Sequence, residues 1–160
     1  MSVGRFLGMV GALIWRSSDG RYLILRRSTE KDYAAGIWEC ITGRVDQGEG
    51  FQDALRREVL EELGVEIQVD FIIGTMHFYR GESIPENEMI GIVYCCTIVD
   101  DQQIRIGWEH DQYRWLNLDE AQEYFPEDYW LLEIIKRGEQ MRELMSPQQL
   151  ILNRERGFEI

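Results

Sequence analysis

Three glutamates stand close together in the stretch that follows Gly50, at positions 58, 61 and 62. If residues 50–63 form a helix, the spacing i, i+3 and i+4 places Glu58, Glu61 and Glu62 on one face. Like charges at this spacing each cost roughly 0.2–0.5 kcal/mol, and anions in the last turn oppose the helix dipole by about 0.3–1 kcal/mol each. A divalent cation would reverse both penalties. The cluster is therefore either a solvated acidic face or a metal site.

The residues before and within this helix favour the metal site. Gly43, Gly48 and Gly50 in the preceding loop allow the backbone to approach a ligand closely. Arg57 lies beside the cluster and could hold a carboxylate in a fixed rotamer through a bidentate pair. Oxygen ligands without a cluster of His and Cys indicate Mg²⁺ or Mn²⁺ rather than zinc.

The segment from Gly43 to Val65 resembles the Nudix box. Gly43, Glu49 and the run Arg57-Glu58-Val59-Leu60-Glu61-Glu62-Leu63-Gly64-Val65 match every defined position of that motif. In this family the box forms a loop–helix–loop that packs against a mixed sheet. The resemblance therefore implies an α/β fold, a Nudix-type α/β/α sandwich with a mixed β-sheet between helices.

The resemblance also implies a hydrolase that acts on phosphoric anhydride bonds. The family cleaves a nucleoside diphosphate linked to another group through attack of water on phosphorus, with Mg²⁺ or Mn²⁺ as cofactor. Glu58 and Glu62 match the family's direct metal ligands, and Glu61 matches a third carboxylate that binds metal directly or through water. Arg57 matches the arginine that orients the glutamates, and Glu49 matches the acid that anchors the loop.

Four residues outside the conserved part of the box are further candidates. Several Nudix enzymes place an additional metal-binding or basic glutamate where this chain has Glu109, and the alternative is a surface acid. Arg27 ends a predicted strand near the site and is a candidate phosphate contact. Arg44 replaces the second glycine that many members have, and it is either a phosphate contact or a solvated charge. Trp38 is a candidate for stacking on a base, with a core position as the alternative.

Other aromatic residues and the two histidines are weaker candidates. Tyr33, Phe78 and Tyr79 could also stack on a base, although such residues are more often part of a core. His77 and His110 are predicted to be structural or exposed rather than catalytic.

Hydrophobic periodicity and turn residues predict the elements that position these side chains. Strands are expected near 5–15, 21–27, 65–80, 89–99 and 113–116, with a short apolar piece at 38–42 and helices at 50–63 and 128–145. Gly64 is expected to end the first helix in a left-handed cap, and Asp119 to cap a short helix. The whole chain, residues 1–160, is predicted to be a single Nudix domain, with the box at 43–65 and a C-terminal helix and tail at 128–160.

Composition limits the partners and the compartment. Lys and Arg number 17 and Asp and Glu number 29, which gives a formal net charge of −12. This charge disfavours nucleic-acid polymers and anionic membranes, whereas a small nucleotide could bind beside a local cation. The three cysteines are interpreted as reduced thiols of a cytoplasmic protein, with Cys95 and Cys96 on opposite faces of a strand. The apolar tail after Pro147 is expected to pack on a partner or on the domain itself, and with the habits of the family it suggests a homodimer.

Two other functions stay open on the same fold. A nucleotide-binding sensor would bind without turnover, but such proteins usually lose glutamates of the box. Isoprenoid isomerisation would need a cysteine in the site, and Cys40 is close to the box. The stretch from Trp38 to Gly43 is also similar to the subgroup that cleaves nucleoside and pterin triphosphates. The leaving group of the substrate is not identified by the sequence.

Overall fold

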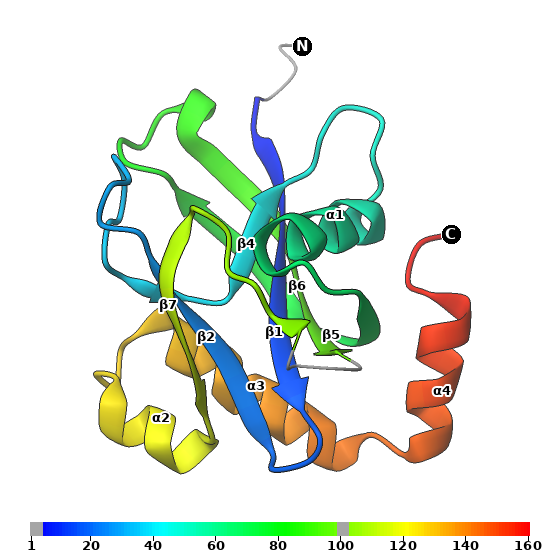
Figure 1. Ribbon diagram of the computed structural model, residues 1–160. Coiled ribbons are helices and arrows are strands. Elements are labelled where there is room, and N and C mark those ends of the chain that lie inside the picture. Colours follow the sequence, from blue (N-terminus) through cyan, green and yellow to red (C-terminus); the bar gives the residue numbers. More distant parts are fainter. Residues whose placement is uncertain (1–4, 99–102) are drawn as a thin grey trace.

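The computed structural model describes residues 5–98 and 103–160, whose strands form one mixed sheet (Figure 1). These strands are β1 (Leu7–Arg16), β2 (Arg21–Arg27), β3 (Trp38–Glu39), β4 (Ile41–Arg44), β5 (Ile67–Tyr79), β6 (Glu88–Ile98) and β7 (His110–Leu116). Their order is β3-β2-β1-β6-β5, with β4 paired to β1 and β7 paired to β2. β1 and β6 run parallel, and the other pairs are antiparallel.

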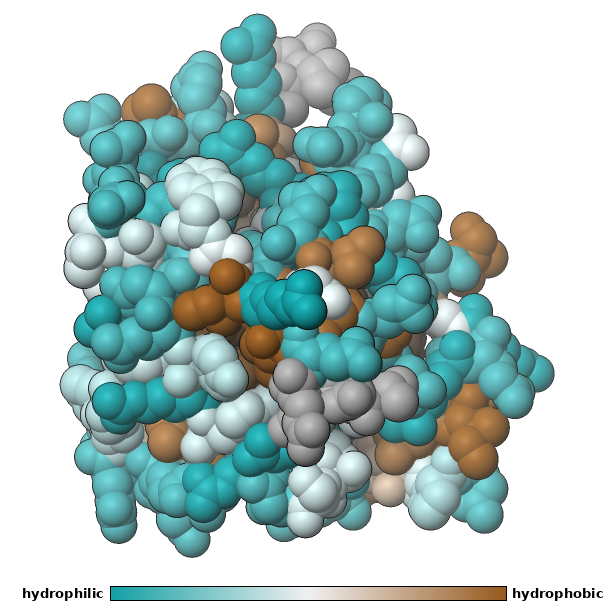
Figure 2. Space-filling view, in the orientation of Figure 1, coloured by the Kyte–Doolittle hydropathy of each residue, from teal (hydrophilic) through white to brown (hydrophobic). Residues whose placement is uncertain are grey.

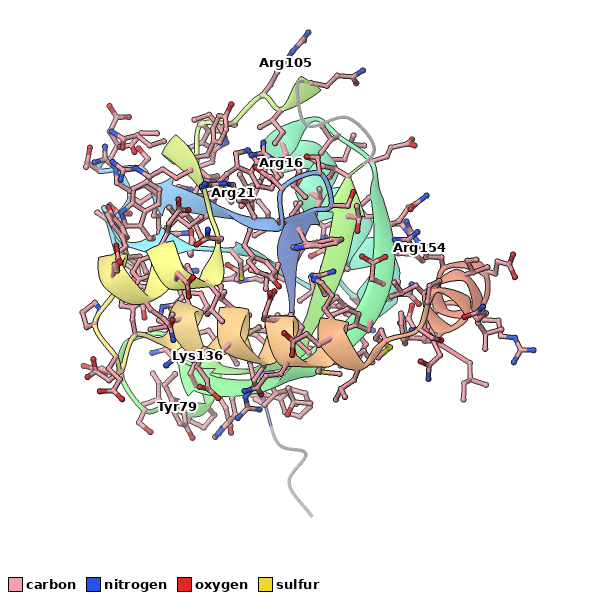
Figure 3. All side chains as sticks on the ribbon, turned by 90° about the horizontal axis from the view of Figure 1, so that it is seen from below. Arg16, Arg21, Tyr79, Arg105, Lys136 and Arg154 are labelled. Atoms are coloured by element: carbon pink, nitrogen blue, oxygen red, sulfur yellow. The ribbon has the colours of Figure 1, made fainter. Side chains whose placement is uncertain are left out.

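Helices cover both faces of this sheet. One core cluster lies under α1 (Phe51–Leu63), and a second lies under α2 (Leu118–Tyr124) and α3 (Trp130–Leu144) on the other face. Figure 3 shows α3 running across its face of the sheet, with α4 (Pro147–Arg156) beside β5. A short 3₁₀ turn, η1 (Pro85–Asn87), leads into β6. The predicted α/β sandwich with a mixed sheet between helices is confirmed.

Successive side chains of the central strands point to opposite faces of the sheet and so contribute to the two core clusters in turn. Ala12 and Ile14 of β1 join the cluster under α1, whereas Leu13 between them joins the cluster under α2 and α3. Cys96 and Cys95 of β6 divide in the same way. The three cysteines of the chain are buried free thiols, as the sequence predicts.

The structure tests the capping residues that the sequence predicts for two helices. Gly64 ends α1 with φ of +67°, and its N–H donates to Leu60 O at 2.9 Å, as predicted. The predicted Asp119 cap is wrong, because Asn117 caps α2 and Asp119 lies in the first turn. Asn117 Oδ1 accepts from Glu120 N at 2.9 Å, and the Glu120 carboxylate accepts from Asn117 N at 3.0 Å. This reciprocal pair satisfies two N–H groups, which Asp119 could not do from inside the helix.

The C-terminal tail folds back onto its own domain. It contains α4, a helix that the sequence analysis did not expect, which begins after a Ser146 cap. Arg154 of α4 pairs at 2.7 Å with Asp70, a buried residue of β5 (Figure 3). Beyond α4, the Glu159 carboxylate accepts the backbone N–H of Phe51 at 2.5 Å, at the start of α1. Of the two surfaces predicted for the tail, the structure shows the domain itself, and the homodimer stays a prediction.

The surface in the view of Figure 2 is largely hydrophilic, in line with the formal net charge of −12. Hydrophobic side chains gather at α4, where Ile151 and Leu152 are exposed. Within residues 5–98 and 103–160, no helix is both long and apolar enough to span a membrane.

Candidate active site

Glu58 of α1 lies against β4 because Gly43 leaves room for its side chain. A Cβ atom at position 43 would lie 1.9 Å from Cδ of Glu58, so only glycine allows this packing. Burial raises the pKa of Glu58, and its Arg57 neighbour opposes that rise. Glu61, one turn further along α1, is more exposed than Glu58, with 60% of its side chain accessible. The helix therefore presents one enclosed and one open carboxylate on the predicted face.

Arg57 holds the loop before α1 and one glutamate of the cluster. Its Nε and Nη2 donate to the two oxygens of Glu49 at 2.8 and 2.9 Å, which is a bidentate pair. Its Nη1 donates to Glu58 Oε1 at 2.8 Å, and its Nη2 donates to Arg44 O at 2.8 Å. Hydrogen bonds from Arg57, then from the Asp46 backbone, lower the pKa of Glu49 to about 2. The arginine thus fixes Glu58 and the 44–49 loop in one arrangement.

Glu62 is the unusual carboxylate of the set. It is 6% exposed, and its Oε2 atom is buried without a hydrogen-bond partner among the residues that the structure describes. Burial, followed by the charges of Glu58, Glu109 and Glu39, raises its pKa to about 9. A buried carboxylate among other carboxylates is costly unless a cation compensates its charge.

A chain of buried polar side chains connects Glu62 to the cavity wall. His110 Nδ1 lies 3.5 Å from Glu62 Oε2, and His110 Nε2 lies 3.0 Å from Glu39 Oε1. Arg27 Nη1 donates to the same Glu39 oxygen at 3.3 Å, and Arg27 Nε donates to Tyr33 O at 2.9 Å. The prediction that His110 is structural agrees with these contacts. Glu39 was not a candidate, although a charged residue inside the apolar piece 38–42 was a usable signal.

Glu109 immediately precedes β7 and acts electrostatically on the same cluster. Its charge raises the pKa of both Glu58 and Glu62, which places it on their side of the molecule. Its carboxylate pairs with Lys31 at 3.0 Å, and its backbone O accepts from Ser28 N at 2.8 Å. The structure therefore places Glu109 within electrostatic range of the glutamates of the box, with its carboxylate paired to Lys31.

A cavity of about 950 Å³ is lined by Glu39, by Glu109 and by Gly43, against which Glu58 packs. This volume is in the range of small-molecule sites. The lining combines cations, carboxylates and aromatic faces, among them Arg27, Lys31, Tyr33, Glu39, Arg44, Phe78, Glu109 and Trp130. The candidate phosphate contacts Arg27 and Arg44 thus lie at the cavity with Tyr33 and Phe78. Lys31 and Trp130 are additional lining residues that the sequence analysis did not select.

Trp38 is not brought to this cavity. Its ring packs in the core cluster under α2 and α3, and its backbone N–H and O both bond to the hydroxyl of Tyr129. Adjacent residues of a strand point to opposite faces, so Glu39 reaches the cavity and Trp38 reaches the core. The core alternative for Trp38 is the one that the structure supports.

The donors at this site fit a hard divalent cation. They are carboxylate oxygens, and the Oε2 atom of Glu62 is buried without a hydrogen-bond partner among the described residues. In the part of the chain that is described, no three His, Cys, Asp or Glu side chains already converge as a ligand set. The Arg57–Glu58 and Lys31–Glu109 pairs hold two of the carboxylates, so binding would require these side chains to turn.

Comparison with known proteins agrees with this geometry. A family model described as NUDIX domain matches residues 7–137, so the chain belongs to the Nudix family. Nucleoside triphosphatase NudI of Escherichia coli is 28% identical over 67% of this chain and 80% of its own length. The predicted class of enzyme, a Nudix hydrolase acting on phosphoric anhydride bonds, is confirmed.

A solved structure and a longer relative complete the comparison. The MutT protein of Methanosarcina mazei superposes with a TM-score of 0.70 at 27% identity, over 89% of this chain and 99% of that one. A protein named octanoyltransferase from Myxococcus xanthus is 30% identical over 77% of this chain. The chain spans 33% of that protein, so the likeness concerns only a part of it.

Proposed function

We propose that this Nudix hydrolase cleaves the diphosphate linkage of a small nucleotide in a reaction that requires Mg²⁺ or Mn²⁺. The observation that carries the proposal is the buried, unpartnered carboxylate of Glu62, which is linked through His110 to Glu39, a lining residue of a cavity that also has cationic side chains. The name of the relative NudI, nucleoside triphosphatase, makes nucleoside triphosphates the first substrates to test. We also propose that residues 1–160 form a single Nudix domain of a cytoplasmic protein, which suits its three buried free thiols.

In the proposed mechanism, Glu58, Glu61 and Glu62 would hold the cation, and Glu109 would join them. When bound, the cation would neutralise diphosphate oxygens and acidify a nearby water. Arg57 keeps Glu58 and the loop in place through the contacts given above. A carboxylate of this group accepts a proton from the water that attacks phosphorus, and the P–O bond to the leaving group breaks in line with that attack.

The cationic lining residues are proposed to bind the phosphates. Arg27 is held by Glu39 and by the backbone of Tyr33, so its guanidinium has a fixed direction at the cavity wall. Arg44 is exposed beside Gly43 and offers a second cation. Tyr33, Phe78 and Trp130 offer aromatic faces for the base, since such rings stack readily on nucleobases.

A substrate panel with product analysis tests this function. Nucleoside triphosphates, dinucleotides and nucleotide sugars would each be incubated with Mg²⁺, Mn²⁺ or chelator, and the products separated by chromatography. We expect release of a mononucleotide, phosphate or pyrophosphate from one class in the presence of metal. Binding of a nucleotide without any hydrolysis would favour the sensor, and rearrangement of an isoprenoid diphosphate would favour an isomerase.

A further inference from the structure

Lys31 is the partner of Glu109 in this structure. Its Nζ atom lies 3.0 Å from Glu109 Oε2 and 3.5 Å from the ring centroid of Trp108. Both charged side chains line the cavity, and the Lys31 side chain is only 14% exposed. The ammonium is thus enclosed between a carboxylate and an indole face, where both interactions are stronger than on an open surface.

A hydrogen bond holds the backbone of Glu109, whereas its carboxylate interacts with several charged side chains. The Glu109 carbonyl accepts the Ser28 N–H at 2.8 Å, which ties residue 109 to the end of β2. Its carboxylate interacts electrostatically with Glu58 and Glu62 as well as with Lys31. An exchange of Lys31 for a bound cation would therefore turn the carboxylate of a residue whose backbone is held by Ser28.

We propose that Lys31 is a phosphate-binding and positioning residue that exchanges Glu109 for a phosphate group of the nucleotide. Without substrate, Lys31 neutralises Glu109 and holds it away from the cation site on α1. When a nucleotide enters the cavity, its phosphate oxygens bind the ammonium, and Glu109 turns toward the glutamates. The inference rests on the proposed function, because it assigns Glu109 to the cation in the loaded site.

The chemistry of lysine suits this exchange better than that of Arg27, another cation that lines the cavity. Arg27 makes directed hydrogen bonds to Glu39 and to Tyr33 O, so it would lose a fixed geometry by changing partner. A lysine ammonium is a point charge on a flexible stem, and it binds a carboxylate or a phosphate without a required plane. Phosphate carries more charge than the single carboxylate that it would replace.

A double-mutant cycle on Mn²⁺ affinity tests the link between Lys31 and Glu109 without turnover. The affinity would be measured by electron paramagnetic resonance for the wild type, Lys31→Met, Glu109→Gln and the double variant. We expect Lys31→Met to tighten Mn²⁺ binding about fivefold in the wild-type background and to have no effect in the Glu109→Gln background. Equal tightening in both backgrounds would show repulsion through space and overturn the inference, as would no change in either.

The phosphate half of the proposal is tested with inorganic pyrophosphate as the probe. In chelator, Lys31→Met should raise the Kd for pyrophosphate at least about tenfold, the scale of one charge-assisted hydrogen bond. With the substrate from the panel, KM should rise similarly while kcat stays within about threefold. A wild-type Kd for pyrophosphate in this variant would overturn the assignment.

A matched control variant tests whether the effects are specific to Lys31, and a second variant covers the case in which Lys31→Met does not fold. Lys136 of α3 (Figure 3) is the other lysine of the chain, and Lys136→Met should leave both affinities unchanged. If Lys31→Met does not fold, Lys31→Gln keeps a polar side chain and takes its place. If the wild type hydrolyses no nucleotide, the proposed function fails, yet both binding measurements still decide the role of Lys31. Absence of Mn²⁺ binding in every protein would overturn both proposals.

Discussion

Replacing Glu62 with glutamine should stabilise the metal-free protein, and the gain should grow with pH. The ordinary pKa of a glutamate is 4.5, and burial with three nearby carboxylates raises that of Glu62 to about 9. The folded protein keeps a proton on Glu62 at pH values where the unfolded chain has released it. The free energy of unfolding therefore falls as the pH rises from about 5 to 9.

The size of this effect follows from the two pKa values. Each pH unit above 4.5 costs up to about 1.4 kcal/mol, so three units, at pH 7.5, cost up to about 4 kcal/mol. Local relaxation and entry of water reduce such penalties. We therefore expect Glu62→Gln, which is neutral at every pH, to be more stable than the wild type by about 2–4 kcal/mol at pH 7.5. The difference should approach zero near pH 5.

Urea unfolding in chelator, followed by circular dichroism from pH 5 to pH 8.5, measures this difference. Glu61→Gln is the matched control, because the Glu61 side chain is 60% exposed and its loss should leave the pH dependence of the wild type unchanged. Parallel stability curves for the wild type and Glu62→Gln, or a less stable variant, would refute the idea that Glu62 is a strained buried acid.

Three further predictions follow from the same contacts. The affinity for Mn²⁺, measured calorimetrically, should rise with pH by up to about tenfold per unit below pH 9, because Glu62 must lose its proton before it binds; a flat profile would exclude Glu62 as a ligand. Arg57→Lys, which cannot reproduce the bidentate pair with Glu49, should lower kcat at least about tenfold in a steady-state assay without unfolding the protein. Glu159→Gln should cost about 0.5–1 kcal/mol in urea unfolding, because a charged acceptor at the start of α1 becomes neutral; an unchanged midpoint would make the contact incidental.

Local patterns in the sequence were enough to predict the helix that carries the glutamates of the box and the glycine that ends it. The spacing of Glu58, Glu61 and Glu62 depends only on helix geometry, and Gly64 ends that helix because its conformation favours glycine. The division of Cys95 and Cys96 between two cores depends only on strand alternation. Such features need no knowledge of which distant segments meet.

The parts that could not be predicted depend on pairing between distant segments. Glu39 contacts His110 because β3 and β7 both pair with β2. The sequence of a single strand does not determine its register with a distant partner. For Trp38 the sequence allowed either base stacking or a core position, and the structure places its ring in the core. Glu159 reaches α1 from 108 residues away, a contact that no local pattern contains. The Lys31–Glu109 ion pair likewise joins two distant segments, so no local pattern predicts it.

The central claim is that the box glutamates hold a divalent cation on which hydrolysis depends. Its most direct test is a metal titration of nucleotide hydrolysis by the wild type and by Glu62→Gln, starting from chelator-treated protein. We predict no turnover in chelator, full recovery with Mg²⁺ or Mn²⁺, and at least about a hundredfold lower kcat for Glu62→Gln at saturating metal. Undiminished turnover in excess chelator, or a variant within tenfold of the wild type, would contradict the claim.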